Sequence, residues 1–400
     1  MRVLVVEDDE ELMLVPAFAG LIQELQRRGL DQAMAAMPPL SGDKDADLAA
    51  FTRVYRRITA GLPDDAAVRQ AVADATIRGM IGALNDNHVA WRHGLHRSAQ
   101  YNIGLSAING ADSHLDPVAA APLYVTEVGK GSPADKAGVR QGDEITAING
   151  VPPYVNGVLS TGVLDWLTDS PDGSPVSLTL HRPVTGATLT ATVPAGPPAP
   201  PDLSSPARLV DGDIGYVQLA GFNTDMVGKV LAGIAELRKG TELRGVVLDL
   251  RGNGGGDADA VTALLSSFVH DKTFGYWCDA RDNCTANRTD DSVPLLHLPL
   301  VVLTDHRCAS ACDAFSNAVK DLHVGKLVGT RTSGIVSGPA DPFMLDDGST
   351  LQLPVFYGLG PNREVINTIG VAADYNAPLT AADLSAGRDP GLDKAVTLLH

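Results

Sequence analysis

Ser310, within the segment Cys308–Asp313, and the glycine-rich turn Asp249–Gly256 could together perform acyl transfer. A serine hydroxyl becomes a useful nucleophile only when a base removes its proton and backbone N–H groups stabilise the developing oxyanion. Both segments follow strand-like apolar runs, which end at Thr304 and Leu250. The pattern therefore indicates acyl transfer, most simply the hydrolysis of peptide bonds.

Ser310 precedes a predicted helix that begins at Ala311. The N–H of Ala311 then lies at a helix N-terminus, where unpaired donors and the positive end of the dipole favour an anion. The alternative is that Ser310 only caps the helix, a role that serine often has. The glycine turn favours the nucleophile, and we predict Gly255 and Ala311 as oxyanion donors, with Gly256 as the alternate for the first.

The turn Gly252–Gly256 suits an oxyanion because glycine amides can face a ligand without an obstructing Cβ. A glycine-rich loop between a strand and a helix can also bind phosphate. This loop, however, lacks both the lysine of a P-loop and the spacing of a dinucleotide-binding turn. The oxyanion role is therefore the better interpretation.

The elements that position these residues belong to a layered α/β domain over residues 209–400, in which apolar strands alternate with helices and pair in parallel. Residues 197–208 form a proline-rich linker. Residues 96–196 alternate strand-like segments with turns and predict a small β-rich module. Residues 1–95 form a helical domain, because apolar residues recur at helical spacing from Asp45 to Leu84.

The predicted strands and helices follow in chain order. In the β-rich module the strands are 103–107, 123–128, 144–148 and 176–181. In the α/β domain strands 214–219, 245–250 and 298–304 alternate with helices 224–238, 258–268 and 311–321.

The chain has 400 residues and a formal net charge of -17, with 44% hydrophobic and 20% charged residues. That composition indicates a folded chain of two or three domains. The acidic balance disfavours nucleic acid and anionic membrane as partners, because both need clustered lysine and arginine. An oligomer of identical chains is left open.

The N-terminal sequence lacks the layout of a secretory leader, and the apolar run Leu12–Ile22 is too short to span a bilayer. We therefore expect a cytoplasmic protein, unless a leader has been removed. Met1–Glu10 also looks like the start of a response-regulator receiver, but the helical residues that follow disfavour that hypothesis.

Four cysteines occur as Cys278 with Cys284 and Cys308 with Cys312. Zinc usually takes closer pairs, so no metal site is predicted, and no cofactor is expected. Unpaired thiols are the default in a reducing compartment, and a disulfide between Cys278 and Cys284 would require an oxidising one.

These segments resemble the tail-specific, or C-terminal processing, serine peptidases of family S41. The resemblance runs from about Ala83 onward and implies a crotonase-like core, a PDZ-like domain, and endopeptidase activity on extended polypeptides or on those recognised by their C-termini. In the core it rests on Asp249–Gly256, Ser310–Asp313, Asp321, Gly370–Asp374 and Gly387–Pro390. In the β-rich module it rests on Tyr124–Val128, Gly131–Val139 and Gly142–Gly150.

The resemblance also separates two catalytic branches. One branch places a lysine base after a Gly-Glu-x-x-x-Gly stretch, but here Gly329–Gly334 is followed by Ile335, which cannot accept a proton. The other, tricorn-type branch takes its base from a Leu-x-Asp-x-His run, which matches Leu84–His88. We therefore predict His88 as the general base, since imidazole titrates near neutral pH.

The partners of the histidine depart from the tricorn-type pattern. Asn367 replaces the glutamate that would orient the imidazole, and Asn87 replaces a serine before the histidine. An amide can orient an imidazole but cannot stabilise the imidazolium as a charge would, so slower turnover is expected. Glu364 is an alternative orienting residue if its loop bends suitably.

The PDZ-like module implies a peptide partner, because such modules add an extended C-terminal peptide to a strand edge. Backbone amides of a loop before the strand hold the peptide carboxylate. The predicted loop comprises Tyr101, Asn102, Ile103, Gly104 and Leu105. Two further hypotheses stay open: a non-peptidase enzyme or binder of a small apolar ligand, and a scaffold that binds C-terminal peptides without cleaving them.

Overall fold

The computed structural model describes residues 10–30, 35–36, 39–82, 89–92, 101–109, 122–155, 158–159, 166–167, 174–196, 207–279, 281–338, 340–345 and 348–400. These residues form two compact units. Unit 1 takes its described residues from Met1–His96 and Ser337–Phe356, and unit 2 from Arg97–Val336 and Tyr357–His400. Residues 337–356 therefore group with N-terminal residues although they lie within the predicted 209–400 domain. The domain boundaries themselves remain a prediction.

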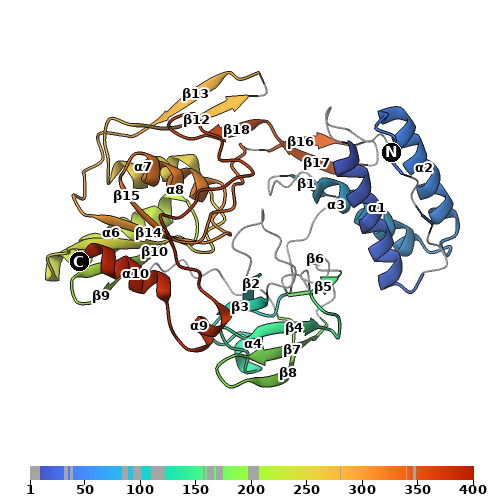
Figure 1. Cartoon of the computed structure of the whole chain (residues 1–400), viewed down its shortest axis with the longest axis horizontal. Helices are drawn as coiled ribbons and strands as arrows, with labels where there is room; N and C mark the ends of the chain where they lie inside the picture. Colours follow the sequence, from blue (N-terminus) through green and yellow to red (C-terminus); the bar gives the residue numbers. More distant parts are fainter. Residues whose placement is uncertain are drawn as a thin grey trace. The chain divides into compact units, whose positions relative to one another are not determined.

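Unit 1 contains the N-terminal helices that the sequence predicts (Figure 1). Its elements are α1 (Glu10–Arg27), α2 (Lys44–Ala60), α3 (Ala66–Gly82) and a sheet in the order β1 (Ala90–Arg92), β17 (Thr350–Pro354) and β16 (Ala340–Met344). The indole N–H of Trp91 in β1 donates to the Ser349 hydroxyl at 2.9 Å. None of the helices in the described segments is both long and apolar enough to cross a bilayer.

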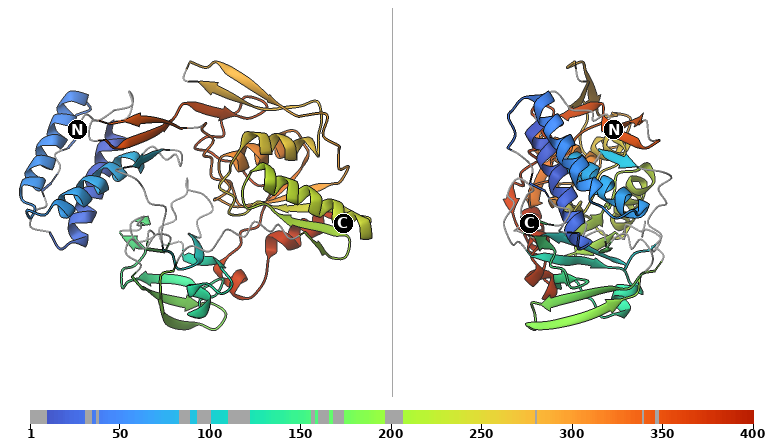
Figure 2. Two further views of the ribbon diagram at one scale, coloured as in Figure 1. Left: turned by 180° about the vertical axis from the view of Figure 1, so that it is seen from behind. Right: turned by 90° about the vertical axis from the view of Figure 1, so that its right-hand side faces the viewer.

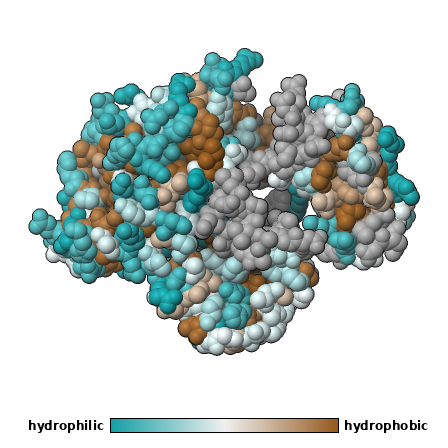
Figure 3. All heavy atoms as spheres, viewed as in Figure 1, coloured by the Kyte–Doolittle hydropathy of each residue, from teal (hydrophilic) through white to brown (hydrophobic). Residues whose placement is uncertain are grey.

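Helices α1 and α3 approach closely because each carries a glycine at their contact. A Cβ on Gly20 would lie 2.3 Å from the Ala75 carbonyl oxygen, and a Cβ on Gly79 would lie 2.2 Å from that of Pro16. Leu21 on α1 is fully buried at this side. The outward surface of the neighbouring helix α2 is largely hydrophilic (Figure 3), as expected for an amphipathic helix.

The β-rich module in unit 2 is a five-stranded antiparallel sheet. Its strands lie in the order β2 (Leu105–Asn109), β3 (Leu123–Val128), β4 (Glu144–Ile148), β7 (Val176–Arg182) and β8 (Ala187–Val193). The short helix α4 (Pro133–Lys136) begins at Ser132, whose side chain accepts a hydrogen bond from the Asp135 N–H. A two-stranded ribbon, β5 (Tyr154–Val155) and β6 (Val158–Leu159), completes the described part of the module. Strand β2 lies at an edge of the sheet.

The core of unit 2 is a six-stranded sheet whose central strands are parallel. Its order is β19 (Tyr375–Asn376), β15 (Gly325–Gly329), β14 (Leu300–Thr304), β11 (Gly245–Asp249), β10 (Ile214–Gln218) and β9 (Arg208–Val210), with only β9 antiparallel. The parallel pairing that the sequence predicts is therefore found.

Helices cover both faces of this sheet (Figures 1 and 2). Helices α6 (Thr224–Gly240), α7 (Ala258–Ser266) and α8 (Ala311–Asp321) cover one face, and α10 (Pro390–Leu399) covers the other, whereas α9 (Ala381–Ser385) packs on the β-rich module. Alternate strand residues face opposite sides. Val246 and Leu248 pack with α6, α7 and α8, whereas Val247 and Val301 pack with Leu399 of α10. A separate sheet joins β13 (Cys284–Arg288), β12 (Thr273–Asp279) and β18 (Phe356–Leu359).

Both cysteine pairs form disulfides, so the default of unpaired thiols does not hold, and the Cys278–Cys284 bond that the sequence left open is present. Strands β12 and β13 pair with Cys278 opposite Cys284, which leaves their Cα atoms 4.0 Å apart. The start of α8 brings Cys312 back to Cys308, with a Cα separation of 5.2 Å. Local backbone geometry thus places each pair within reach of a bond.

The segment that contains α9 joins the core to the β-rich module. Tyr124 of β3 donates its hydroxyl to the Leu379 carbonyl oxygen at 2.5 Å. Ile108 and Tyr124 form a small apolar cluster with Ala381 and Leu384. A Cβ on Gly142 would lie 2.3 Å from the Ser385 nitrogen, so the turn before β4 seats directly on α9.

Candidate active site

Ser310 lies at the N-cap of α8, after a short loop that follows the carboxyl end of β14 at Thr304. Its backbone is in the positive-φ region, with φ 58° and ψ -118°. The Cys312 N–H donates to the Ala309 carbonyl oxygen at 3.0 Å and closes a turn that has Ser310 at its first central position. These angles are those of a type II′ turn, where glycine is the usual residue. Ser310 is therefore held in a conformation that is strained for serine.

Ordinary caps elsewhere in the chain have a different backbone. Asp43, Asn223 and Thr380 cap α2, α6 and α9 with φ values of -100°, -140° and -87°, all in the extended region. Extended backbone is typical of N-cap residues. The strained backbone of Ser310 thus goes beyond what capping requires, which favours the nucleophile over the simple cap.

Gly255 lies against the Ser310 turn and leaves no room for a side chain. A Cβ at this position, where φ is 102°, would lie 2.6 Å from the Ser310 Cβ and 3.0 Å from the Ala311 nitrogen. The Gly255 N–H donates to Oδ1 of Asn253 at 2.8 Å. Because this amide is engaged, the geometry favours the alternate oxyanion donor, Gly256.

Gly256 forms a parallel β-bridge with Phe222, whose hydrogen bonds are made by the neighbours of Gly256, namely Gly255 and Asp257. The Phe222 N–H donates to the Gly255 carbonyl oxygen, and the Asp257 N–H donates to that of Phe222. In such a parallel bridge the N–H of Gly256 points away from Phe222. The Ala311 N–H begins α8 and is one of the donors that a helix leaves unpaired within itself. Gly255 and Ala311 thus adjoin the Ser310 turn, while the roles of Gly255, Gly256 and Ala311 as oxyanion donors stay predictions.

Asn253 is a bracing residue that the sequence analysis did not identify. It is fully buried, and its side-chain amide donates to the Leu219 carbonyl oxygen at 2.8 Å. Its own carbonyl oxygen accepts the Ala309 N–H at 3.0 Å. One asparagine thus ties the glycine turn to the serine turn. The signal in the sequence is a single asparagine between two glycines, directly after an apolar strand.

Asp313 is the second residue that the sequence analysis did not assign. Its carboxylate is fully buried and accepts hydrogen bonds from the backbone N–H groups of Ser310, Gly334 and Ile335 at 2.9–3.0 Å. The Ser310-x-x-Asp313 spacing is that of a capping box and could have revealed it. Burial raises the pKa of Asp313 to about 6, against these donors and the Thr332 hydroxyl, which lower it.

We predict that Asp313 makes stability depend on pH near 6. Its folded-state pKa of about 6 exceeds the ordinary 3.8, so the folded chain binds the proton more tightly than the unfolded chain. This contribution is fully present below about pH 4 and is lost as pH rises through 6, on the order of 3 kcal/mol at most. In urea unfolding, wild type should gain stability relative to Asp313→Asn between pH 8 and pH 5. A constant or opposite difference would show that the pKa is not raised.

Asn367 and Glu364, the two residues considered for orienting the imidazole, lie at different distances from Ser310. Oδ1 of Asn367 accepts the Val336 N–H at 2.9 Å, and the neighbouring Ile335 carbonyl oxygen accepts the Ser310 N–H at 2.9 Å. Asn367 is therefore two hydrogen-bonded steps from Ser310. Ile335, the residue at the lysine position of the other branch, does adjoin the serine.

Glu364 lies along α8, away from the N-terminus of the helix. It accepts a short hydrogen bond from the Asn317 side chain, seven residues after Ser310, and therefore about 10 Å along the helix. Burial and the neighbouring Glu364 carboxylate raise the pKa of Asp321 at the end of α8. Glu364 is thus engaged with Asn317 and Asp321, and the structure does not favour it as the orienting residue.

His88 and Asn87 lie outside the described residues, so their predicted roles are carried forward as predictions. The loop predicted to bind a peptide carboxylate precedes β2. Ile103 there is fully buried and its carbonyl oxygen accepts the Ala134 N–H at 2.9 Å, while Tyr101 is exposed. Within the described part of the chain, no cluster of three or more histidine, cysteine or acidic side chains could hold a metal ion.

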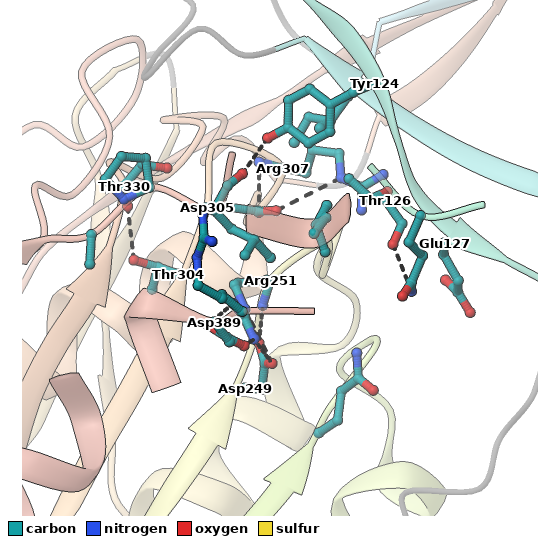
Figure 4. A pocket seen from close by; sticks show the side chains of 18 of the residues that line it. Tyr124, Thr126, Glu127, Asp249, Arg251, Thr304, Asp305, Arg307, Thr330 and Asp389 are labelled. Atoms are coloured by element: carbon teal, nitrogen blue, oxygen red, sulfur yellow. Dashed lines mark hydrogen bonds and ion pairs between the residues drawn. The ribbon is translucent and has the colours of Figure 1, made fainter. Parts of the chain in front are cut away.

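A buried ion-pair network lies at the end of β11, where the glycine turn begins (Figure 4). The Arg251 guanidinium donates to Asp249 at 2.6 Å and to Asp389, the N-cap of α10, at 2.7 Å. Burial opposes ionisation of Asp389, but Arg251 outweighs it and lowers the pKa of Asp389. Tyr216 donates its hydroxyl to Asp249 at 2.7 Å. The network fixes the strand end from which the glycine turn departs.

A cavity of about 550 Å³ lies between the β-rich module and the carboxyl ends of the core strands. Its lining includes Tyr124 and Thr126 on one side and Arg251 and Arg307 on the other (Figure 4). Ser310 does not line it. The cavity is therefore distinct from the serine turn, although both lie at the same edge of the sheet.

Comparisons with known proteins agree with these features. Residues 213–377 match the family model described as peptidase family S41, and residues 124–182 match the PDZ domain model. The carboxy-terminal processing protease CtpB of Bacillus subtilis is 28% identical over 309 residues, which cover 76% of this chain and 62% of that protein. The chloroplastic C-terminal processing peptidase of Tetradesmus obliquus is 30% identical over 289 residues, covering 68% and 59%. The chain thus spans about 60% of the length of these relatives.

Solved structures show the same fold. The photosystem II D1 C-terminal processing protease aligns with a TM-score of 0.52 and 25% identity, and the alignment covers 93% of each chain. Mature CPAF aligns with a TM-score of 0.55 over 96% of each chain, but at 15% identity. These likenesses confirm a mixed α/β fold with N-terminal helices, a PDZ sheet and a mostly parallel core sheet.

Proposed function

We propose, from the premise that residues 213–377 form a domain of peptidase family S41 and residues 124–182 a PDZ domain, that this protein is a serine endopeptidase. The observation that carries the proposal is the strained backbone of Ser310, with φ 58°, at the N-terminus of α8 and against Gly255. A strained residue at a helix N-terminus is a common setting for a catalytic group. We also propose the crotonase-like arrangement for the core.

In the proposed reaction the Ser310 hydroxyl attacks the peptide carbonyl carbon while His88 accepts its proton. The oxyanion is stabilised by N–H groups at Ala311 and at Gly256 or Gly255. His88 then protonates the leaving amine, and water hydrolyses the acyl-enzyme. The finer assignment of the base to a tricorn-type histidine is part of this proposal.

The proposed substrate is an extended polypeptide recognised through its C-terminus. Strand β2 lies at the edge of the PDZ sheet, and the segment Tyr101–Leu105 leads into it, with Leu105 as the first residue of the strand. Addition of a peptide strand to such an edge supplies main-chain hydrogen bonds, and loop amides bind the terminal carboxylate.

The proposal is tested by labelling with a fluorophosphonate probe, measured by intact mass. Wild type is expected to take one probe on Ser310, Ser310→Ala none, and His88→Ala is expected to react about a hundredfold more slowly, because a general base contributes at least that factor. Ser292→Ala, an exposed serine in a loop, is the matched control and should label like wild type. Unchanged labelling of His88→Ala would refute the assignment of the base.

A second candidate is a protein that binds C-terminal peptides without cleaving them. It is favoured by Asn367, which lacks a charge and whose Oδ1 already accepts the Val336 N–H. Retained peptide binding, with no labelling of wild type and no cleavage of an unstructured polypeptide, would select this candidate.

The expected cytoplasmic location stays a proposal. The two disulfides weigh against it, because disulfides persist mainly in oxidising compartments. Fractionation of cells, with alkylation of free thiols before lysis, distinguishes a cytoplasmic location from an oxidising compartment.

A further inference from the structure

We infer that the disulfide Cys308–Cys312 is a positioning device that holds Ser310 in its attacking conformation. The inference rests on the proposed function, since positioning of the hydroxyl matters only if Ser310 attacks a substrate. The sequence analysis gave these cysteines no role in the chemistry of Ser310. The structure gives them a bond that encloses the serine.

The conformation that needs holding is the backbone of Ser310 itself. At φ 58° and ψ -118° a side chain crowds its own backbone, so a free serine would leave this region. The hydrogen bond from the Cys312 N–H to the Ala309 carbonyl oxygen closes the turn, but it joins only the turn residues. Asn253, Asp313 and Ile335 hold it from outside through single hydrogen bonds, each of which can open without breaking a covalent bond.

The disulfide adds a covalent restraint to these hydrogen bonds, because it links the residue before the turn to the last residue of the turn. Both cysteines are fully buried. The Cys312 sulfur lies 3.9 Å from the Leu250 carbonyl oxygen, and the Cys308 sulfur lies 3.6 Å from the Ser316 hydroxyl oxygen. The bond is therefore packed between the end of β11 and the second turn of α8.

Loss of the bond would alter the turn. A dithiol reductant breaks the S–S bond, delivers two electrons and two protons to form two thiols, and is itself oxidised to a disulfide. Two thiols need more room than the bonded pair, and a packed interior resists that expansion. The turn must then relax, and with it the Ala311 N–H and the contact with Gly255.

The consequence is a defect in chemistry with intact peptide binding. The PDZ sheet has its own apolar core, to which neither cysteine belongs, so we expect its loop and edge to keep their structure when the cysteines are replaced. We therefore expect kcat to fall while KM stays within about twofold, since a displacement of about 1 Å at a reacting group can cost a hundredfold in rate. If the disulfide only stabilised the fold, its removal would lower the melting temperature without this selective loss of kcat.

The experiment compares two double variants that each lose one disulfide. Cys308→Ala/Cys312→Ala is expected to label with fluorophosphonate at least about tenfold more slowly than wild type. Cys278→Ala/Cys284→Ala, which removes the disulfide of the β12–β13 hairpin, should label at the wild-type rate. Thermal unfolding of both variants, and kcat and KM for an unstructured peptide, are measured in parallel.

Equal labelling by both variants and wild type would overturn the inference while leaving the proposed function intact. Absence of labelling in wild type would instead refute the proposed function. If the Cys308→Ala/Cys312→Ala protein does not fold, Cys278→Ala/Cys284→Ala is treated with dithiothreitol, and the remaining disulfide is followed by intact mass. Labelling that is unchanged after its reduction would likewise overturn the inference.

Discussion

Replacement of Gly255 by alanine is expected to lower peptide hydrolysis and fluorophosphonate labelling by at least about a hundredfold. The new Cβ would lie 2.6 Å from the Ser310 Cβ and 2.7 Å from the Ala309 carbonyl oxygen, and the φ of 102° is one that alanine rarely adopts. Backbone and nucleophile cannot both keep their places, so the serine turn must move. Steady-state hydrolysis and labelling rates measure the effect.

The adjacent glycine provides a matched control. A Cβ on Gly254 would meet no atom within 4 Å, and its φ is not positive. Gly254→Ala should therefore retain activity within about twofold, as expected for a substitution without steric conflict. Full activity of Gly255→Ala would show that this glycine does not adjoin the reacting serine.

Replacement of Arg251 by methionine is expected to lower the free energy of unfolding by about 3–5 kcal/mol. The Arg251 side chain is 16% exposed and bonds Asp249, whose side chain is 3% exposed, and Asp389. Methionine fills similar volume but leaves a buried carboxylate without its counter-charge. Urea unfolding at pH 7.5 measures the loss.

A surface ion pair in the same core is the control. Arg244 and Asp213 are 45% and 32% exposed, and solvent screens their interaction. Arg244→Met should cost less than about 1 kcal/mol. A loss of similar size in both variants would indicate that the buried network carries no special weight. Arg251 immediately precedes the glycine turn. We therefore also expect Arg251→Met to lose activity at urea concentrations lower than those that unfold it.

The elements nearest the candidate site could be predicted closely from local sequence. Helix α8 begins at Ala311 and ends at Asp321, as predicted, and β3 spans the predicted residues 123–128. Each is defined by local signals, namely a cap and an apolar stripe for the helix and an apolar run between turns for the strand. The serine and the glycine turn are adjacent because consecutive parallel strands deliver them to one edge of the sheet.

Long-range features could not be predicted in the same way. Strand β1 pairs with β17, so Trp91 lies opposite Leu351, and no local pattern encodes a pairing across more than 250 residues. The sequence analysis allowed a Cys278–Cys284 disulfide only in an oxidising compartment and did not consider Cys308–Cys312, because it relied on compartment, whereas antiparallel register places Cys278 opposite Cys284. The role of Glu364 depended on a loop path that sequence spacing does not determine.

The segment from residue 377 onward has a consequence for how the protein is made. It seats the PDZ sheet through Leu379, Ala381 and Leu384, and it covers one face of the core sheet through Leu399. A ribosome adds these residues after both of the surfaces that they cover. A nascent chain that stalls before residue 377 would therefore display two bare apolar surfaces at once, a form that chaperones and quality-control proteases recognise.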